Sequence, residues 1–180
     1  MLHKQLLSSP KFDLTIKRLC YQLIENHNNF SNTAIIGLHP RGVFLANRIH
    51  EELKKILPKA NIDFGNLDIT FFRDDFRRRE SALVPNSTNI NFIIEGKKVI
   101  LVDDVLYTGR TIRAGMDAML AYGRPKKVEL LVLVDRRFSR EIPIEPDYIG
   151  IQVDSIASQN VRVSWKETDD SDKIELITGE

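Results

Sequence analysis

The segment VILVDDVLYTGRT, residues Val99 to Thr111, decides the fold of this chain. Its first four residues are apolar and mostly β-branched, which predicts a buried strand. Two adjacent carboxylates, Asp103 and Asp104, come next, and a Thr-Gly-Arg-Thr turn at 108–111 leads into a helical pattern. Backbone N–H groups and hydroxyls at such a helix start can hold a phosphate group. The carboxylates can hold sugar hydroxyls or a hydrated Mg²⁺, so the segment predicts a site for a phosphorylated sugar.

The size and composition of the chain limit the number of domains and the kinds of partner that we expect. Its 180 residues are enough for one domain with a single core, and we expect one domain over 1–180. The net charge of +1 gives no general attraction to nucleic acid. We find no apolar run of about 18 residues for a membrane span and no signal peptide. The single cysteine, Cys20, is expected to be buried in a helix rather than reactive. Together these features predict a cytoplasmic protein with no DNA or membrane partner.

Hydrophobic periodicity predicts alternating helices and strands. Apolar residues at helical spacing predict helices at about 10–28, 45–56 and 112–120. Apolar or alternating runs predict strands at 33–38, 99–102, 128–134, 147–153 and 160–165, and one long strand or hairpin arm at 62–72. The tail, 168–180, is mostly polar. Strands that alternate with helices indicate an α/β fold with a parallel sheet covered on both faces.

The loops that follow the strands are the candidates for a binding site. Ligands of parallel α/β sheets bind at the carboxyl ends of the strands, so the loops 39–42, 103–111 and 135–140 should meet at one edge. The polar segment 73–91 is long for a loop in a compact domain. We interpret it as a lid that closes over the site and excludes water.

Some residues near this edge allow two interpretations. Arg41 can bind a phosphate through paired hydrogen bonds, although a common βα turn would look the same. Arg136 and Arg137 can bind diphosphate or flank a base, and a structural salt bridge is equally compatible with each. His27 is expected on a solvated helix face, and the histidines have no metal-ligand spacing. Trp165 is expected in the core rather than under a base.

The segment Val99 to Thr111 resembles the diphosphate-sugar motif of the type I phosphoribosyltransferases. Other stretches extend the resemblance to one member family, the PyrR-type pyrimidine-operon attenuator/uracil phosphoribosyltransferases. These stretches are Gly37 to Gly42, Leu67 to Asp75, Gly115 to Ala118, Gly123 to Pro125, Val134 to Arg136, Arg140 to Ile144 and Asp147 to Gly150. The resemblance covers nearly the whole chain up to about residue 167. Tyr107 stands where the purine enzymes of this fold carry an acidic general base, which disfavours a purine phosphoribosyltransferase.

The resemblance implies the type I phosphoribosyltransferase fold, with a mostly parallel sheet, a small hood and a flexible lid. It also implies that uracil and 5-phosphoribosyl diphosphate (PRPP) react to give UMP and diphosphate. Mg²⁺ would be required, and substrate and water would hold it near Asp103 and Asp104. Catalytic roles are implied for these two acids and for Arg73. The residues implied to bind substrates are His39, Pro40, Arg41, Gly42, Asp74, Val105, Leu106, Tyr107, Thr108, Gly109, Arg110, Thr111, Arg136 and Arg137.

The resemblance further implies a homodimer or larger homo-oligomer, and it leaves an alternative function open. In that alternative the chain is a uridine-nucleotide-responsive attenuator with weak catalysis, whose basic dimer face binds an mRNA stem-loop. Glu145 and Ile151 stand where the family pattern has positive charge, which favours the enzyme. Residues 153–157 also depart from the family's usual Pro-Thr-Ser-like stretch. The salt dependence of RNA binding separates the two functions.

Overall fold

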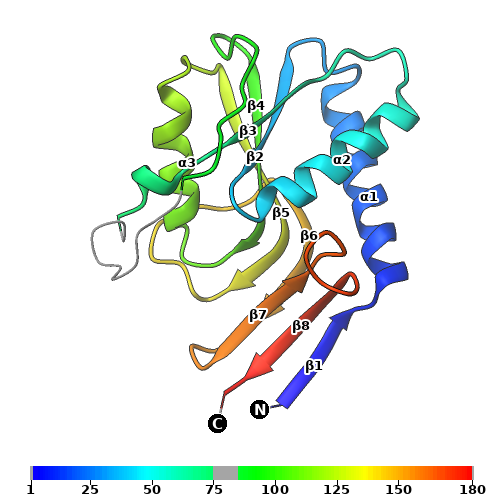
Figure 1. Ribbon diagram of the computed structural model, residues 1–180, viewed down its shortest axis with the longest axis vertical. Coiled ribbons are helices and arrows are strands. Elements are labelled where there is room, and N and C mark those ends of the chain that lie inside the picture. The colour runs from blue at the N-terminus through cyan, green and yellow to red at the C-terminus, as the bar shows by residue number, and fades with distance from the viewer. Residues whose placement is uncertain (1, 75–84, 180) are drawn as a thin grey trace.

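The structure, a computed structural model, describes residues 2–74 and 85–179 and contains a large and a small β-sheet (Figure 1). Its elements are, in chain order, β1 (Leu2–Leu7), α1 (Ser9–His27), β2 (Thr33–Leu38), α2 (Gly42–Ile56), β3 (Asp63–Leu67), the 3-10 helix η1 (Thr70–Phe72), β4 (Lys98–Leu106), α3 (Arg110–Leu120), β5 (Lys127–Arg137), β6 (Tyr148–Asp154), β7 (Gln159–Ser164) and β8 (Lys173–Thr178). The large sheet is parallel, with the strand order β3-β2-β4-β5-β6. The predicted α/β fold is therefore confirmed.

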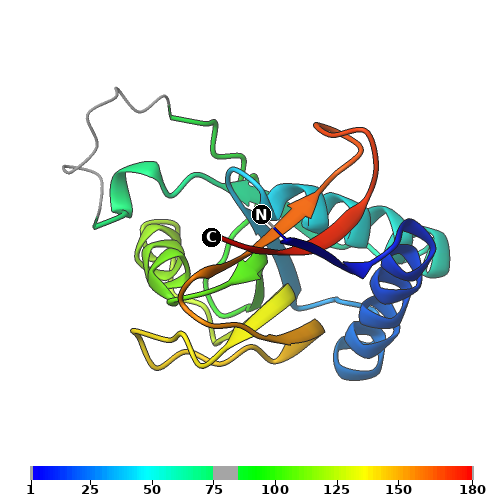
Figure 2. The same ribbon diagram turned by 90° about the horizontal axis from the view of Figure 1, so that it is seen from below.

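Helices cover both faces of the large sheet, with α3 on one side and α1 and α2 on the other (Figure 2). Successive side chains of the central strand β4 point to opposite faces. Ile100 and Val102 are buried in the cluster beneath α1 and α2, whereas Val99 and Leu101 are buried beneath α3. A strand covered on both faces needs an apolar side chain at each of these positions, which explains the uninterrupted apolar run that the sequence shows.

The start of α2 lies directly against the carboxyl end of β4. A Cβ atom at Gly42 would lie 2.5 Å from the carbonyl oxygen of Val102 and 2.9 Å from Cα of Asp103. No side chain fits at such distances, so glycine is what lets the helix start approach the strand. The loop between β2 and α2 is thereby placed beside the acid pair.

The small sheet is antiparallel, has the strand order β1-β8-β7 and lies at the bottom of Figure 1; we call it the hood. Trp165, directly after β7, is fully buried where the hood meets the helices. Its ring centroid is 5.1 Å from that of Phe12 and 5.9 Å from that of Phe44. The prediction that Trp165 lies in the core is confirmed.

The two ends of the chain are more regular than predicted. The sequence analysis did not predict β1, and β8 lies within the tail 168–180. The two strands pair with each other, so each satisfies backbone hydrogen-bonding groups of the other. The strand predicted at 160–165 is β7, at 159–164.

The long strand or hairpin arm predicted at 62–72 is wrong, because β3 ends at Leu67. The Asp68 carboxylate then accepts hydrogen bonds from Thr70 N at 3.0 Å and from Thr70 Oγ1 at 2.6 Å. Such local bonds compete with a strand ladder and turn the chain into η1. Residues 75–84, the middle of the predicted lid 73–91, lie outside the described residues.

The prediction for His27 is also wrong, because its side chain is buried rather than solvated. Its Nε2 lies 2.8 Å from Glu129 Oε2 and 3.1 Å from the Tyr148 hydroxyl. Cys20 is buried as predicted, and burial raises the pKa of its thiol to about 12, which makes it unreactive.

Across the described ranges, no helix is long and apolar enough to cross a membrane. The cytoplasmic location stays a prediction.

Candidate functional site

The predicted site residues gather at the carboxyl ends of β2, β4 and β5. A cavity of about 190 Å³ lies at this edge. Its walls are formed by Arg73, Asp74, Asp103, Val105, Leu106, Tyr107, Thr108, Gly109, Arg110, Thr111 and Ile112. The root of the predicted lid, the end of β4 and the start of α3 thus surround one space, as the sheet-edge rule anticipates.

The two acids are buried at the end of β4 rather than exposed after it. Asp103 faces the cavity, and its Oδ1 accepts a hydrogen bond from Asp104 N at 2.9 Å. Burial, followed by the charge of Asp104, raises the pKa of Asp103 well above its ordinary value. Burial also raises the pKa of Asp104, although Arg41 opposes the rise. Two buried carboxylates side by side favour a cation or hydroxyl donors between them.

Asp104 joins the first loop to the hood. Arg41, just before α2, donates from Nε to Asp104 Oδ2 at 3.1 Å and from Nη2 to the carbonyl oxygen of Val163 in β7. The buried indole N–H of Trp165 makes no hydrogen bond of ordinary geometry. It nevertheless acts on Asp104, where it opposes the rise in the pKa that burial causes. Three separate parts of the chain therefore meet at this carboxylate.

The rest of the first loop lies between β2 and α2. His39 N donates to the carbonyl oxygen of Leu67 at 3.0 Å, which joins the ends of β2 and β3. The His39–Pro40 peptide bond is cis. Gly42 begins α2 against Asp103, as described above. The structure thus brings Arg41 and Gly42 to the acid pair.

The turn at 108–111 has the geometry of an anion site. Gly109 has a φ of 91°, a left-handed conformation that favours glycine. The hydroxyl of Thr108 accepts from Arg110 N at 3.4 Å, and α3 begins at Arg110. The first N–H groups of a helix have no intrahelical partner, and the helix dipole makes this end positive. The cavity at the start of α3 therefore suits a phosphate group.

Asp74, at the root of the lid segment, lies against α3. Arg110 forms ion pairs with Asp74 and with Glu141, the latter at 2.6 Å, while Arg113 lies 3.7 Å from Asp74. Arg73 lines the cavity, and its charge acts to lower the pKa of Asp103. Arg73 thus faces the space between the acids and the phosphate turn.

A second hollow, of about 440 Å³, lies between Tyr107 and the strand ends that lead to the hood. It is lined by Tyr107, Phe138, Ser139, Asp154, Ser155, Ile156 and Ala157. The side chain of Phe138 is 82% exposed, and its φ is 65°. A bulky residue in this conformation marks local strain that function can explain. Phe138 was not predicted as a site residue, although it lies in the loop 135–140 that was expected at this edge.

Arg136 lies between the two hollows and is buried. Its guanidinium carbon is 4.0 Å from the centroid of the Tyr107 ring, and its Nε donates to Ser155 Oγ at 3.0 Å. Its Nη2 donates to the carbonyl oxygen of Gln159 at 2.7 Å. Arg137 instead forms an exposed ion pair with Asp154 at 2.6 Å. Of the two alternatives for Arg137, the structure thus contains the salt bridge.

The comparisons with known proteins agree with this geometry. Residues 3–168 match the protein family described as "Phosphoribosyl transferase domain". The chain is 44% identical over 172 residues to "Bifunctional protein PyrR" of Desulfosudis oleivorans, covering 96% of this chain and 94% of that protein. It is 43% identical over 173 residues to "Bifunctional protein PyrR" of Microcystis aeruginosa, covering 96% of each.

Solved structures share the fold. A hypoxanthine phosphoribosyltransferase of Trypanosoma cruzi has a TM-score of 0.70 and 16% identity, covering 98% of this chain and 97% of that one. A hypoxanthine phosphoribosyltransferase of Staphylococcus aureus has a TM-score of 0.65 and 16% identity, covering 85% and 79%. At these identities the likeness establishes the fold alone.

Proposed function

Because the chain belongs to the phosphoribosyl transferase domain family and, within it, to the PyrR proteins, we propose that it transfers a phosphoribosyl group from PRPP to uracil, giving UMP and diphosphate. One observation carries this proposal. Asp103 and a helix start suited to phosphate line the same cavity, with the buried Asp104 directly beside Asp103, and Tyr107 lines both this cavity and a second hollow with room for a base. This arrangement suits a phosphorylated sugar joined to a base.

The 5-phosphate binds at the turn 108–111 in this proposal. The backbone N–H groups at the start of α3 donate to it, together with the hydroxyls of Thr108 and Thr111. Asp103 and Asp104 accept hydrogen bonds from the ribose hydroxyls. Fixing both ends of the ribose phosphate in this way orients C1′ toward the second hollow, which is the positioning contribution to catalysis.

Diphosphate leaves from the side of Arg41 and Arg73. Both cations lie near the acid pair: Arg41 binds Asp104 directly, and the charge of Arg73 acts on Asp103. Their positive charge stabilises the negative charge that develops on the leaving diphosphate. The resemblance also implied that Arg136 binds diphosphate, but its stacking on Tyr107 and its bond to Ser155 support a place beside the base instead.

The residues of the candidate site are suited to a Mg²⁺ ion that binds together with PRPP. Two buried carboxylates with raised pKa values gain from a nearby divalent cation. In the part of the chain that the structure describes, no three His, Cys, Asp or Glu side chains gather as a metal site. Bound with diphosphate, Mg²⁺ would supply charge neutralisation to the leaving group.

In the reaction, N1 of uracil forms a bond to C1′ as the bond from C1′ to the diphosphate oxygen breaks. The N1 proton passes to water, and the electron pair of the broken bond leaves with diphosphate. Positive charge develops on the ribose ring in between, and the Asp103 and Asp104 carboxylates stabilise it. Uracil N1–H is acidic enough that we assign no strong base. This agrees with Tyr107 at the position where the purine enzymes of this fold carry an acidic general base.

The name "Bifunctional protein PyrR" of the relatives keeps a second function in view, the uridine-nucleotide-responsive binding of an mRNA stem-loop by a homodimer. This function would need a basic surface. Within the described residues, Arg110, Arg137 and Arg162 each form an exposed ion pair with a carboxylate. This pairing reduces the positive charge available to RNA and favours the enzyme.

The proposal is tested by measuring the release of diphosphate from PRPP in the presence of Mg²⁺ with uracil, hypoxanthine, guanine or no base. Release with uracil alone supports the proposal. Release with a purine alone would keep the fold and overturn the choice of base. If no base gives release, the RNA-binding function becomes the leading one, and the salt dependence of binding to a stem-loop would test it.

A further inference from the structure

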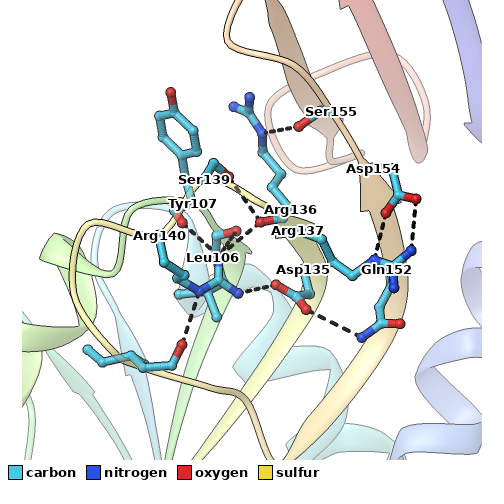
Figure 3. A network of polar contacts seen from close by, with 11 residues as sticks. Leu106, Tyr107, Asp135, Arg136, Arg137, Ser139, Arg140, Gln152, Asp154 and Ser155 are labelled. Carbon is cyan, nitrogen blue, oxygen red and sulfur yellow. Dashed lines mark hydrogen bonds and ion pairs between the residues drawn. The ribbon is translucent and has the colours of Figure 1, made fainter.

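Arg140 occupies the centre of a polar network behind the phosphate turn (Figure 3). Its Nε donates to the carbonyl oxygen of Ile144 at 3.0 Å. Its Nη1 donates to the carbonyl oxygens of Tyr107, at 2.7 Å, and Arg136, at 2.9 Å. Its Nη2 forms an ion pair with Asp135, which is buried. One side chain therefore joins the end of β4, the end of β5 and the loop that follows β5.

The residues after Arg140 extend the same contact. The backbone N–H groups of Glu141 and Ile142 both donate to the carbonyl oxygen of Thr108, at 3.0 and 3.1 Å. A Cβ atom at Gly109 would lie 3.4 Å from the Ile142 side chain, so the turn lies in van der Waals contact with this segment. Residues 140–144 thus contact and support the phosphate turn; we call this segment the brace.

The Arg140 side chain faces inward. Only 22% of its side chain is exposed, and its donors are directed at carbonyl groups and at Asp135. A planar guanidinium can bond several oxygens in a fixed geometry, which a lysine ammonium cannot reproduce. Leu106 and Asp135 are the last paired residues of β4 and β5, so the carbonyl groups of Tyr107 and Arg136 lie just past the end of this ladder. The fork of Arg140 fixes their separation.

We propose that Arg140 is a positioning residue that holds the phosphate turn in its binding conformation before substrate arrives. The assignment of the turn to a phosphate rests on the proposed function, whereas the bracing itself does not. Preorganised N–H groups bind an anion without first being ordered, so the brace lowers the cost of binding. Loss of the brace should weaken phosphate binding. It should not directly slow the step in which the bond from C1′ to diphosphate breaks.

The variant Arg140→Met tests the brace, together with the double variant Arg140→Met/Asp135→Asn. Arg140→Met alone leaves the buried Asp135 carboxylate without its ion-pair partner, and an unpaired buried charge destabilises the fold by itself. The double variant removes that charge. Arg162→Met is the matched control, because Arg162 is an exposed arginine of the hood whose ion pair, with Asp169, lies outside the candidate site. Arg140→Lys keeps the positive charge and loses the fork.

Hydrogen exchange of the full-length protein without substrate gives the first readout. We expect the amides of Glu141 and Ile142, which donate to the carbonyl oxygen of Thr108, to exchange about tenfold faster in the double variant, as the loss of roughly one net hydrogen bond would produce. Strand β7 should exchange as in the wild type, and Arg162→Met should change neither region. Unchanged exchange at Glu141 and Ile142 in a folded double variant would overturn the proposal. If the double variant does not fold, the same comparison is made with Arg140→Lys.

Binding and kinetics give the second readout. We expect the Kd for ribose 5-phosphate and the KM for PRPP to rise about tenfold, with kcat changed less than KM. Partial recovery in Arg140→Lys relative to the double variant supports a role for charge as well as for the fork. A fall in kcat at unchanged KM would overturn the positioning role. If the wild type turns over no base, the exchange experiment still decides the brace, so the two proposals fail separately.

Discussion

Arg41 Nε lies 3.1 Å from Asp104 Oδ2, and the same guanidinium reaches the hood through the carbonyl oxygen of Val163. The acid that would face the ribose is therefore connected to the part of the chain that would cover the base. Any movement of the hood relative to β4 must break or follow this bridge. The position of Asp104 is thus linked to that of the hood.

Asp104→Asn should remove most turnover while the fold persists. The amide keeps the size of the side chain but cannot stabilise positive charge on the ribose, and losses of such groups reduce kcat by about 10²-fold or more. Asp63→Asn is the control, because Asp63 pairs with Lys97 at the amino end of β3, away from the cavity. Steady-state kinetics and thermal unfolding measure both. Near-normal turnover in Asp104→Asn would remove its assigned role.

The raised pKa of Asp103 predicts that this residue lowers stability at neutral pH. A carboxyl whose pKa is higher in the folded than in the unfolded protein makes the unfolded state bind fewer protons, so stability falls as pH rises through that range. Asp103→Asn removes this penalty. We expect its melting temperature to exceed that of the wild type at pH 8 and the difference to shrink at low pH, whereas turnover is lost. A lower melting temperature at pH 8 would contradict the prediction.

Trp165 is the only tryptophan of the chain, so its indole N–H gives one unambiguous NMR signal. We expect this signal to shift in Asp104→Asn, because the indole acts on that carboxyl. In Trp165→Phe, the pKa of Asp104 should rise, and the acid limb of the pH profile of kcat/KM should move to higher pH.

The matched control for Trp165→Phe is Phe12→Leu. It disturbs the same aromatic cluster without removing a donor, so it should lower the melting temperature and leave the acid limb in place. An acid limb that moves equally in both variants would show that the indole N–H has no specific effect on Asp104.

Local patterns were sufficient to predict the central part of the fold. The apolar run of β4 and the residue types of the turn 108–111 can each be recognised from neighbouring residues alone, and the sheet-edge rule then places the loops together. The pairing of β1 with β8 joins the two ends of the chain, and no local pattern specifies such a partner. The stacking of Arg136 on Tyr107 likewise depends on how β4 and β5 are aligned in space.

The burial of His27 was predictable in principle. It lies four residues after Leu23, which belongs to the apolar stripe of α1, so it continues the buried face. Glu129 gave a second signal, because it is a charged residue within the apolar run of β5. Neither signal shows alone that the two side chains meet across 102 residues of sequence.

The His27–Glu129 pair should make stability depend on pH. Burial acts to raise the pKa of Glu129, but hydrogen bonds from Lys127, Tyr148 and His27 outweigh it, and the pKa is lowered. Burial lowers the pKa of His27. Both shifts make the unfolded state bind more protons in acid. The contribution of His27 is present at neutral pH and is lost as pH falls below about 6.5, whereas that of Glu129 is lost only as pH falls below about 4.5.

Glu129→Gln tests this pair by denaturant unfolding at pH 7.5 and pH 5. We expect a loss of about 2 kcal/mol at pH 7.5, the scale of a hydrogen bond to a charged group, and a loss at least as large at pH 5, because Glu129 is still ionised there and acts to raise the pKa of His27. Lys173 and Glu175 form a partly exposed ion pair in β8, so Glu175→Gln is the matched control and should cost little at either pH. Because Glu129 lies away from the cavity, kcat should not change. A smaller loss at pH 5 than at pH 7.5 would contradict the prediction, because it would mean that the charge of Glu129 does not stabilise protonated His27.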